Sequence, residues 1–179
     1  CVLLADGFEE IEALTVVDLL RRAKVYVDTV SITDDYTVRG AHGIPVQTED
    51  LITEIDFKES DMIVLPGGMP GTTNLKEDEN VRKAVQEAYD DGRYVAAICA
   101  APTILADMGL LKGKRATCYP DMESEIEDAY LTGAPVATDE NIITSQGVGT
   151  AIDFALKLIE VLISEEKAVE IADSIVYQR

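Results

Sequence analysis

The stretch Tyr94-Val-Ala-Ala-Ile-Cys99-Ala-Ala-Pro102 decides the fold, because its pattern predicts a buried strand that turns sharply into a helix. The run from Val95 to Ile98 is continuously apolar, as is typical of parallel strands that are covered on both faces. Pro102 suits the first turn of a helix, because its missing N–H group has no partner there in any case. The sequence therefore predicts a strand-to-helix elbow with Cys99 at its corner.

Cys99 has two interpretations at such an elbow. The free N–H groups and the positive dipole end of the following helix lower a thiol pKa, so we expect a nucleophilic thiolate. A free cysteine is equally often a small buried hydrophobic residue without chemistry. Its placement alone does not separate the two, so the other motifs of the chain have to decide.

Composition limits the class of protein. The 179 residues are 47% apolar, which predicts a single folded domain over residues 1–179 with a substantial core. Lys and Arg number 15 against 34 Asp and Glu, and the resulting net charge of −19 repels both phosphate backbones and anionic lipid. We therefore expect neither a stably bound nucleic acid nor a membrane as a partner, and no apolar run approaches the ~20 residues of a membrane span.

The cysteines indicate the compartment. Cys1, Cys99 and Cys118 are too few and too odd in number for a disulfide framework, which predicts a reducing, cytoplasmic setting. The chain shows no signal-peptide pattern. It opens directly on a strand-like run from Cys1 without a start methionine, so we expect a few residues to precede it.

Strand-like and helix-like segments alternate along the chain, which predicts a doubly wound, mostly parallel α/β sheet. The expected strands cover residues 2–5, 24–32, 61–65, 95–98 and 115–119, with paired strands at 36–39 and 44–47 and at 136–138 and 142–144. The expected helices cover residues 9–22, 80–91, 102–108, 122–128, 150–163 and 164–176. Thr150 with Asp153 has the form of a capping box, and Ser164 is a second cap.

Acidic residues crowd the start of the first helix. Glu9, Glu10 and Glu12 suit a helix N-terminus electrostatically, and that role accounts for two of the three. Glu9 and Glu12 stand three residues apart and share one helix face. This face lies at the carboxyl end of a strand, where open α/β sheets bind their ligands.

Two loops hold further candidates. Gly67 and Gly68 follow an apolar strand, and glycine amides in such a turn can face a developing oxyanion, although Pro-Gly-Gly also simply ends strands. His42, the only histidine, lies between glycines in a predicted hairpin loop. Such a histidine is more often solvated than catalytic, but a loop can also reach a neighbouring subunit's site.

Four segments together resemble a known family. They are Ala5-Asp-Gly-Phe-Glu9-Glu-Ile-Glu12, Leu65-Pro-Gly-Gly68, Ala96-Ala-Ile-Cys99-Ala-Ala-Pro102 and Thr144-Ser-Gln-Gly-Val-Gly-Thr150. Their order and spacing resemble the ThiJ/PfpI (DJ-one) superfamily nearly end to end, and most of all the branch of the parkinsonism-associated deglycase and the bacterial YajL protein. The resemblance implies a flavodoxin-like sheet with a cysteine nucleophile elbow, and a homodimer.

The resemblance also implies roles for residues. Cys99 matches the reactive nucleophile, and Glu12 matches a glutamate held protonated beside its sulfur, as a carboxyl next to a thiolate would be. Amides at Gly68 and Ala100 would form the oxyanion pocket. Other residues expected to line the pocket are Gly67, Glu9 and Tyr119.

Departures from the family pattern narrow the activity. Tyr119 stands where the deglycase has a histidine, and Ala100 stands where the protease branch has one. No histidine follows the cysteine, as amidotransferases require. His42 matches an arginine that points toward the partner's site in the family dimer, so a cross-subunit role is conceivable. Cys118 is either a resolving thiol for oxidised Cys99 or, more typically, a buried strand residue.

We therefore predict a cofactorless thiol enzyme that acts on small α-oxoaldehydes such as methylglyoxal, or on their early glycation adducts, by the glyoxalase III or deglycase reaction. The rival hypothesis is a redox-sensing stress protein or chaperone that signals by oxidation of Cys99. A protease or amidase, or a thiazole monophosphate biosynthesis protein, is less well supported. The sequence offers no zinc-type His/Cys cluster and no phosphate-binding loop, so we expect neither a metal nor a nucleotide cofactor.

Overall fold

A computed structural model describes residues 1–178, and its centre is a seven-stranded sheet in the order β10-β11-β7-β6-β1-β2-β5. All neighbouring strands are parallel except β10, which runs antiparallel to β11. The strands of this sheet are β1 (Val2–Leu4), β2 (Thr29–Ser31), β5 (Asp50–Leu51), β6 (Met62–Leu65), β7 (Tyr94–Ile98), β10 (Val136–Asp139) and β11 (Ile142–Ser145). The predicted doubly wound, mostly parallel sheet is confirmed, and its arrangement is flavodoxin-like.

Two small sheets lie outside the main one. Strands β3 (Thr37–Arg39) and β4 (Pro45–Gln47) form the predicted antiparallel hairpin. Strands β8 (Arg115–Ala116) and β9 (Tyr130–Leu131) pair in parallel.

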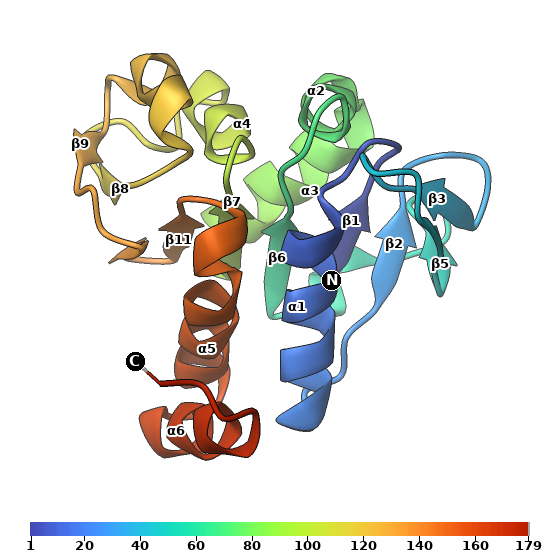
Figure 1. The fold of residues 1–179 in the computed structure, drawn as a ribbon. Coiled ribbons are helices and arrows are strands. Elements are labelled where there is room, and N and C mark those ends of the chain that lie inside the picture. The colour runs from blue at the N-terminus through green and yellow to red at the C-terminus, as the bar shows by residue number, and fades with distance from the viewer. Residues whose placement is uncertain (179) are drawn as a thin grey trace.

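Helices cover both faces of the main sheet (Figure 1). They are α1 (Glu10–Arg22), α2 (Gly71–Glu77), α3 (Glu79–Asp90), α4 (Pro102–Asp107), α5 (Ala151–Leu162) and α6 (Glu165–Ser174), with 3-10 helices η1 (Phe57–Glu59), η2 (Pro120–Ile126) and η3 (Val148–Thr150). Helices α1 and α5 lie side by side over one face, and α6 packs across the end of α5. Helices α3 and α4 cover the opposite face.

Alternation along the central strands divides the core in two. Val2 and Leu4 of β1 pack with α1 and α5, whereas Leu3 between them packs with α3 and α4. Every one of these side chains is buried, because successive residues of a strand point to opposite faces of a covered sheet. The result is a rigid three-layer body that holds the loops at the carboxyl edge of the sheet.

Several predicted elements are shorter or different in the structure. The strand expected over 24–32 is only Thr29–Ser31, because Val25 N–H donates to the carbonyl of Leu20 and so belongs to the turn after α1. The strand expected over 115–119 keeps only Arg115–Ala116. The helix expected over 122–128 is the 3-10 helix Pro120–Ile126, and helix α2 was not predicted at all.

The capping-box prediction at Thr150 is wrong, whereas the cap at Ser164 is confirmed. The Thr150 hydroxyl lies 2.7 Å from Ser145 Oγ and donates to the carbonyl of Gly147, so it ties the preceding loop together instead of capping α5. This loop lies beside the Cys99 elbow, because β11 and β7 are neighbours in the sheet.

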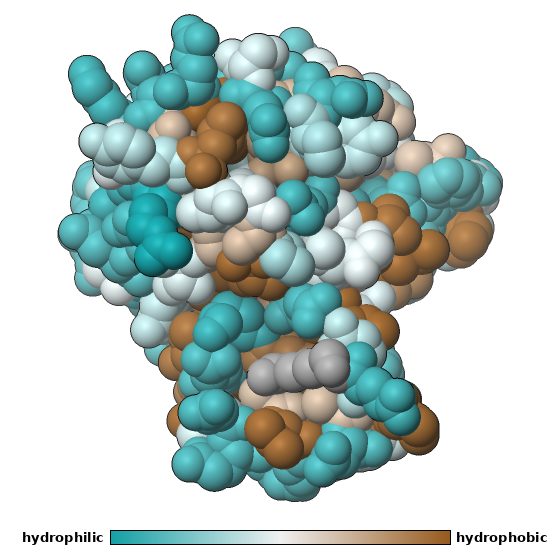
Figure 2. Space-filling view, turned by 60° about the vertical axis from the view of Figure 1, so that its left-hand side comes forward, coloured by the Kyte–Doolittle hydropathy of each residue, from teal (hydrophilic) through white to brown (hydrophobic). Residues whose placement is uncertain are grey.

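The surface is strongly polar. On the face shown in Figure 2, apolar side chains emerge as separate small patches among hydrophilic ones. Within residues 1–178, no helix combines the length and the apolar character that crossing a bilayer requires.

Candidate active site

The elbow predicted at Cys99 is present. Cys99 follows β7 directly and has a φ of 64°, a left-handed conformation that is uncommon outside glycine. Two backbone hydrogen bonds fix it: Cys99 N–H donates to the Ser145 carbonyl (3.0 Å), and Tyr119 N–H donates to the Cys99 carbonyl (2.8 Å). Such a strained residue at the end of a buried strand is typical of functional sites.

Two backbone amides point at the sulfur of Cys99. The N–H groups of Ala100 and Gly68 lie near it and act to lower the pKa of the thiol. Gly68 has a φ of 91°, and a Cβ atom there would lie 2.4 Å from the backbone nitrogen of Glu9. Only glycine therefore fits this turn, which aims an amide at the thiol.

Glu12 comes from the first turn of α1 and is completely buried next to Cys99. Its Oε2 accepts a hydrogen bond of 2.9 Å from Gly67 N–H. Its Oε1 has no partner of good hydrogen-bond geometry within residues 1–178, but it interacts with the nearby Cys99 thiol. A Cβ atom at Gly67 would lie 2.6 Å from Cys99 Cβ and 2.8 Å from Glu12 Oε2, so the glycine lets the two groups meet.

The electrostatics of this pair correct one prediction. Burial, and then the neighbouring Glu12 carboxyl, raise the pKa of the Cys99 thiol to about 12, and the two amides oppose this only in part. The expected lowering of the thiol pKa by the helix is therefore wrong, since α4 has only six residues and burial outweighs its dipole. Burial raises the pKa of Glu12 to about 7, in the direction expected for a carboxyl held neutral.

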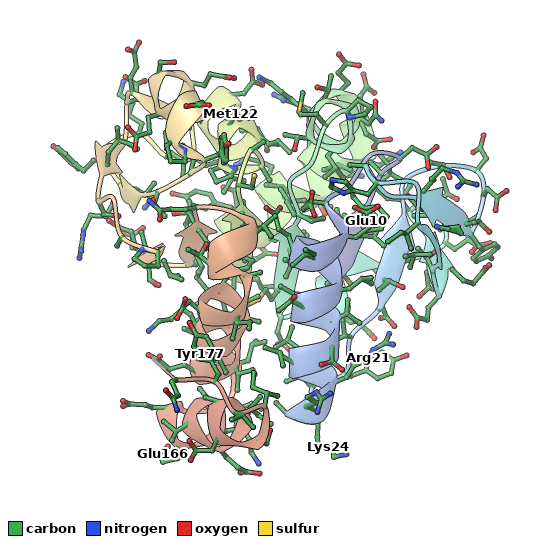
Figure 3. The ribbon with its side chains drawn as sticks, viewed as in Figure 1. Glu10, Arg21, Lys24, Met122, Glu166 and Tyr177 are labelled. Atoms are coloured by element: carbon green, nitrogen blue, oxygen red, sulfur yellow. The ribbon has the colours of Figure 1, made fainter. Side chains whose placement is uncertain are left out.

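Glu9, Glu10 and His42 form a second group beside the first. Glu10 is buried at the start of α1 (Figure 3), and its Oε1 accepts from His42 N–H at 2.8 Å. The His42 ring nitrogen Nδ1 lies 2.8 Å from Glu10 Oε2 and 3.6 Å from Glu9 Oε2. Among the described residues, these three could hold a cation, because their ligand atoms all lie within 4.8 Å of one another.

This second group changes the roles expected of its members. Glu9 caps α1, with its Oε1 accepting from Ile11 N–H at 3.4 Å, and its other oxygen faces His42. Glu9 still adds negative charge near Glu12, which contributes to the raised pKa of that carboxyl. His42 remains exposed at its ring, and its partners in this chain are glutamates rather than Cys99.

Cys118 and Tyr119 lie on the other side of the elbow. Cys118 is fully buried in the core beneath α3 and α4, where burial raises the pKa of its thiol to about 11. Cys99 instead packs against the core of α1 and α5. These separate surroundings favour the structural interpretation of Cys118. Tyr119 is partly exposed and lies near Gly147, a residue to which the sequence assigned no role, although it belongs to the Thr144 to Thr150 motif.

Residues 1–161 match the sequence profile of the DJ-1/PfpI family. The chain belongs to this family. It is 39% identical over 175 residues to protein DJ-1 homolog B of Arabidopsis thaliana, covering 97% of this chain but only 40% of that protein. It is 33% identical over 178 residues to the glutathione-independent glyoxalase DJ-1 of Schizosaccharomyces pombe, covering 93% of this chain and 92% of that protein.

Structural comparison agrees with the family assignment. The oxidized form of Toxoplasma gondii DJ-1 superimposes with a TM-score of 0.94 at 36% identity, covering 99% of this chain and 97% of that one. The DJ-1/PfpI fold of this chain therefore presents one cysteine, one buried glutamate and two amides at a single point.

Proposed function

We propose that this DJ-1/PfpI protein is a thiol enzyme that converts small α-oxoaldehydes, such as methylglyoxal, to hydroxy acids, or acts on their early adducts with amines and thiols. The observation that carries the proposal is the meeting of the Cys99 sulfur, the Glu12 carboxyl and the amides of Gly68 and Ala100. The printed name of the S. pombe relative, a glutathione-independent glyoxalase, supports it.

The raised pKa values suggest how the reaction starts. Burial raises the pKa of Glu12 to about 7, so its carboxyl can gain and lose a proton near neutral pH, while the Cys99 thiol keeps its proton. The carboxylate takes that proton as the sulfur attacks the aldehyde carbon. A C–S bond forms, the carbonyl oxygen becomes an oxyanion facing the amides of Gly68 and Ala100, and Glu12 returns the proton to give a hemithioacetal.

Glu12 then moves a second proton. Its carboxylate removes the hydrogen from C1 and delivers a proton to C2, while the proton of the C1 hydroxyl passes to the oxygen on C2, which turns the hemithioacetal into a thioester of lactate. Water then attacks the acyl carbon of the thioester and the C–S bond breaks. The hydroxyl of the water becomes part of the carboxyl group of lactate, and its other proton returns to the Cys99 sulfur. Methylglyoxal and one water thus give lactate, and the scheme needs no metal or nucleotide.

The test compares two cysteine variants. Cys99→Ser should abolish lactate formation from methylglyoxal, because a serine hydroxyl next to a carboxyl with a pKa of about 7 is a far weaker nucleophile. Cys118→Ser is the matched control and should keep the activity, since that thiol lies in the opposite core. Equal rates in Cys99→Ser and the wild type would end the proposal.

A redox sensor is the second candidate, because the T. gondii relative is described in an oxidized form. Peroxide would add two oxygens to Cys99, and a protonated Glu12 would donate a hydrogen bond to the sulfinate. Intact mass after mild peroxide separates the candidates. Selective addition of two oxygens at Cys99 without aldehyde turnover favours the sensor, and turnover without selective oxidation favours the enzyme.

We also propose that the protein is a homodimer in a cytoplasmic setting, with a small aldehyde rather than nucleic acid or membrane as its ligand. Ile11 and Leu14 of α1 and Ile44 of the hairpin loop are partly or largely exposed apolar side chains that a second copy would cover. Light scattering of the wild type and of Ile44→Asp tests the dimer, and a monomeric wild type would contradict it.

A further inference from the structure

Glu9, Glu10 and His42 bring three metal-ligating atoms together outside the Cys99 site. Nδ1 of the His42 ring lies 2.8 Å from Glu10 Oε2 and 3.6 Å from Glu9 Oε2. In a tetrahedral zinc site with bonds of about 2.0–2.2 Å, the ligand atoms are about 3.3–3.5 Å apart. The contact from His42 to Glu10 therefore has to open by about 0.5 Å to admit such an ion, and the contact to Glu9 already has nearly the required length.

Glu9 points into this cluster with an oxygen that lacks a donor. The residue is only 9% exposed, and its Oε1 accepts from Ile11 N–H at 3.4 Å. Its Oε2 accepts no hydrogen bond from any residue that the structure describes, and faces the His42 ring at ion-pair distance. Carboxyl oxygens that are largely buried normally have a hydrogen bond or a bound ion as partner. The Oε2 atom of Glu9 therefore marks the point where a cation would lie.

The loop that carries His42 is held in place by hydrogen bonds that do not involve its ring. Ala41 N–H donates to the Phe8 carbonyl (2.8 Å). His42 N–H donates to Glu10 Oε1 (2.8 Å), which leaves Glu10 Oε2 to face the ring. The backbone thus positions the three ligand atoms in advance, and a cation would replace only the contact between the ring and the carboxyl.

Charge also favours a cation at this point. Two carboxyl groups face one histidine, and in residues 1–178 no Lys or Arg forms an ion pair with either of them. The positive end of the α1 dipole opposes a cation, but it amounts to only about half an elementary charge. Two carboxylates outweigh it, so the cluster remains attractive to a divalent cation.

The donor set indicates which kind of ion would bind. Ca²⁺ and Mg²⁺ prefer oxygen ligands alone, whereas an imidazole nitrogen together with carboxylate oxygens suits Zn²⁺. The His42 side chain is 69% exposed, so water can reach the fourth position of such an ion. Spacing in the sequence does not reveal this set, because 32 residues separate His42 from Glu10.

We propose that Glu9, Glu10 and His42 bind one Zn²⁺ ion, with water as the fourth ligand. The ion links the start of α1 to the β3–β4 hairpin loop and takes no part in the proposed reaction. The inference therefore does not rest on the proposed function, and loss of aldehyde turnover would leave it standing.

Calorimetric titration of the metal-free protein with zinc chloride tests the proposal and should show binding at this site. Glu9→Gln and His42→Ala each remove one ligand and should weaken this binding at least about 10-fold, since even the loss of an outer partner of a metal ligand costs about 10- to 100-fold. Glu165→Gln is the matched control and should change nothing. Helix α6 also begins with two adjacent glutamates, but His42 is the only histidine of the chain and faces α1 instead.

Thiols are the competing zinc ligands of this chain. Cys1→Ser and Cys99→Ser should therefore keep the zinc affinity of the wild type. Loss of binding in either of them, with His42→Ala unchanged, would assign the ion to a thiol and overturn the proposal. Absence of zinc binding in the wild type would overturn it as well.

The ring resonances of His42 give a second readout that identifies the ligand directly. One equivalent of zinc should shift them in the wild type, and the same addition should shift them much less in Glu9→Gln. Ring resonances that do not move while zinc binds would contradict the site. Thermal unfolding checks that the variants are folded. If Glu9→Gln does not fold, His42→Ala decides alone, because it removes an exposed ring and keeps the N–H bond to Glu10.

Discussion

Glu10 and Glu12 stand two residues apart in the first turn of α1, both are buried, and their pKa values move in opposite directions. Burial alone raises the pKa of either carboxyl. For Glu10, hydrogen bonds from the His42 ring and from the backbone amides of Glu10, His42 and Ile44 outweigh burial and lower the pKa. For Glu12, burial is opposed only by the amide of Gly67 and the Cys99 thiol. These two donors do not outweigh it, and the pKa rises to about 7.

The comparison shows that the number of hydrogen-bond donors, and not burial, decides whether each of these two buried carboxyls is stable as an anion. A carboxylate with several N–H donors is stable as an anion and serves as a fixed anchor. A carboxyl with few donors stays close to the point where it gains and loses a proton at neutral pH, which suits general acid–base chemistry. Glu10 therefore holds the β3–β4 hairpin loop against α1, and Glu12 is the group proposed to move protons.

The largest expected effect is on catalysis. Glu12→Gln should lower turnover of methylglyoxal by roughly 10²- to 10⁴-fold, because an amide cannot accept the proton of the thiol. In the wild type, the rate should rise with pH through a midpoint near 7, as Glu12 loses its proton. Rates measured between pH 5 and 9 test both expectations, because Glu12→Gln should lower the rate and should also remove its increase around pH 7.

Glu10→Gln is the matched control for that experiment. It changes a buried glutamate of the same turn but leaves the thiol and its proton acceptor in place. Its rate should keep the rise around pH 7 even if its absolute value changes. A profile in which Glu12→Gln keeps the rise, or Glu10→Gln loses it, would reverse the roles assigned to the two residues.

The next effect is on stability, and its sign is opposite to that of most buried substitutions. The pKa of Glu12 rises from an ordinary 4.5 to about 7 on folding, so the native state binds the proton more tightly. The wild type therefore loses stability as the pH rises from about 4.5 to 7, by roughly 3 kcal/mol. Glu12→Gln removes this penalty and should unfold at higher urea than the wild type at pH 8, with a smaller difference at pH 5.

The sequence predicted the parts of the site that depend on local geometry. The elbow at Cys99, the Gly67–Gly68 turn and the helical face of Glu12 follow from turn residues and helix spacing, which act over a few positions. The direction in which the pKa of the Cys99 thiol shifts does not follow from such local patterns, because it depends on how deeply the folded core buries the sulfur. The same holds for the nearness of Gly147 to Cys99 and Tyr119, which arises only because β11 lies beside β7.

The partner of Glu10 was equally out of reach of the sequence. His42 lies 32 residues away, and the contact exists only because the hairpin folds back over the start of α1. The same contact explains why a glycine lies at position 40 of this loop, since a Cβ atom there would lie 2.3 Å from the Glu10 carboxyl. The three glutamates at positions 9, 10 and 12 look alike in the sequence, and the loop that covers each one decides its role.

Removing the anchor should destabilise the protein. Glu10→Ala removes the charged acceptor of the His42 and Ile44 amides, and hydrogen bonds to a charged group contribute on the order of 1–3 kcal/mol. Urea unfolding at pH 7 measures the loss. Thr37→Ala in β3 is a control on the same hairpin, since its hydroxyl bond to Gln47 is long (3.3 Å) and exposed. Equal stability of Glu10→Ala and the wild type would show that the hairpin loop needs no anchor.

The smallest effect is on the titration of His42, and it tests the same contact without changing the fold. The hydrogen bond from the His42 ring to Glu10, together with the charges of Glu9 and Glu10, raises the pKa of His42 above its ordinary 6.5. This contact therefore stabilises the folded state below pH 6.5 and weakens as the pH rises through the raised value. The ring resonances of the single histidine report its pKa directly by NMR. Glu10→Gln should lower that pKa and Glu12→Gln should leave it nearly unchanged, because of these two residues only Glu10 contacts the ring. An equal shift in both variants would mean that the charge of the whole helix end, and not the Glu10 contact, sets the protonation of His42.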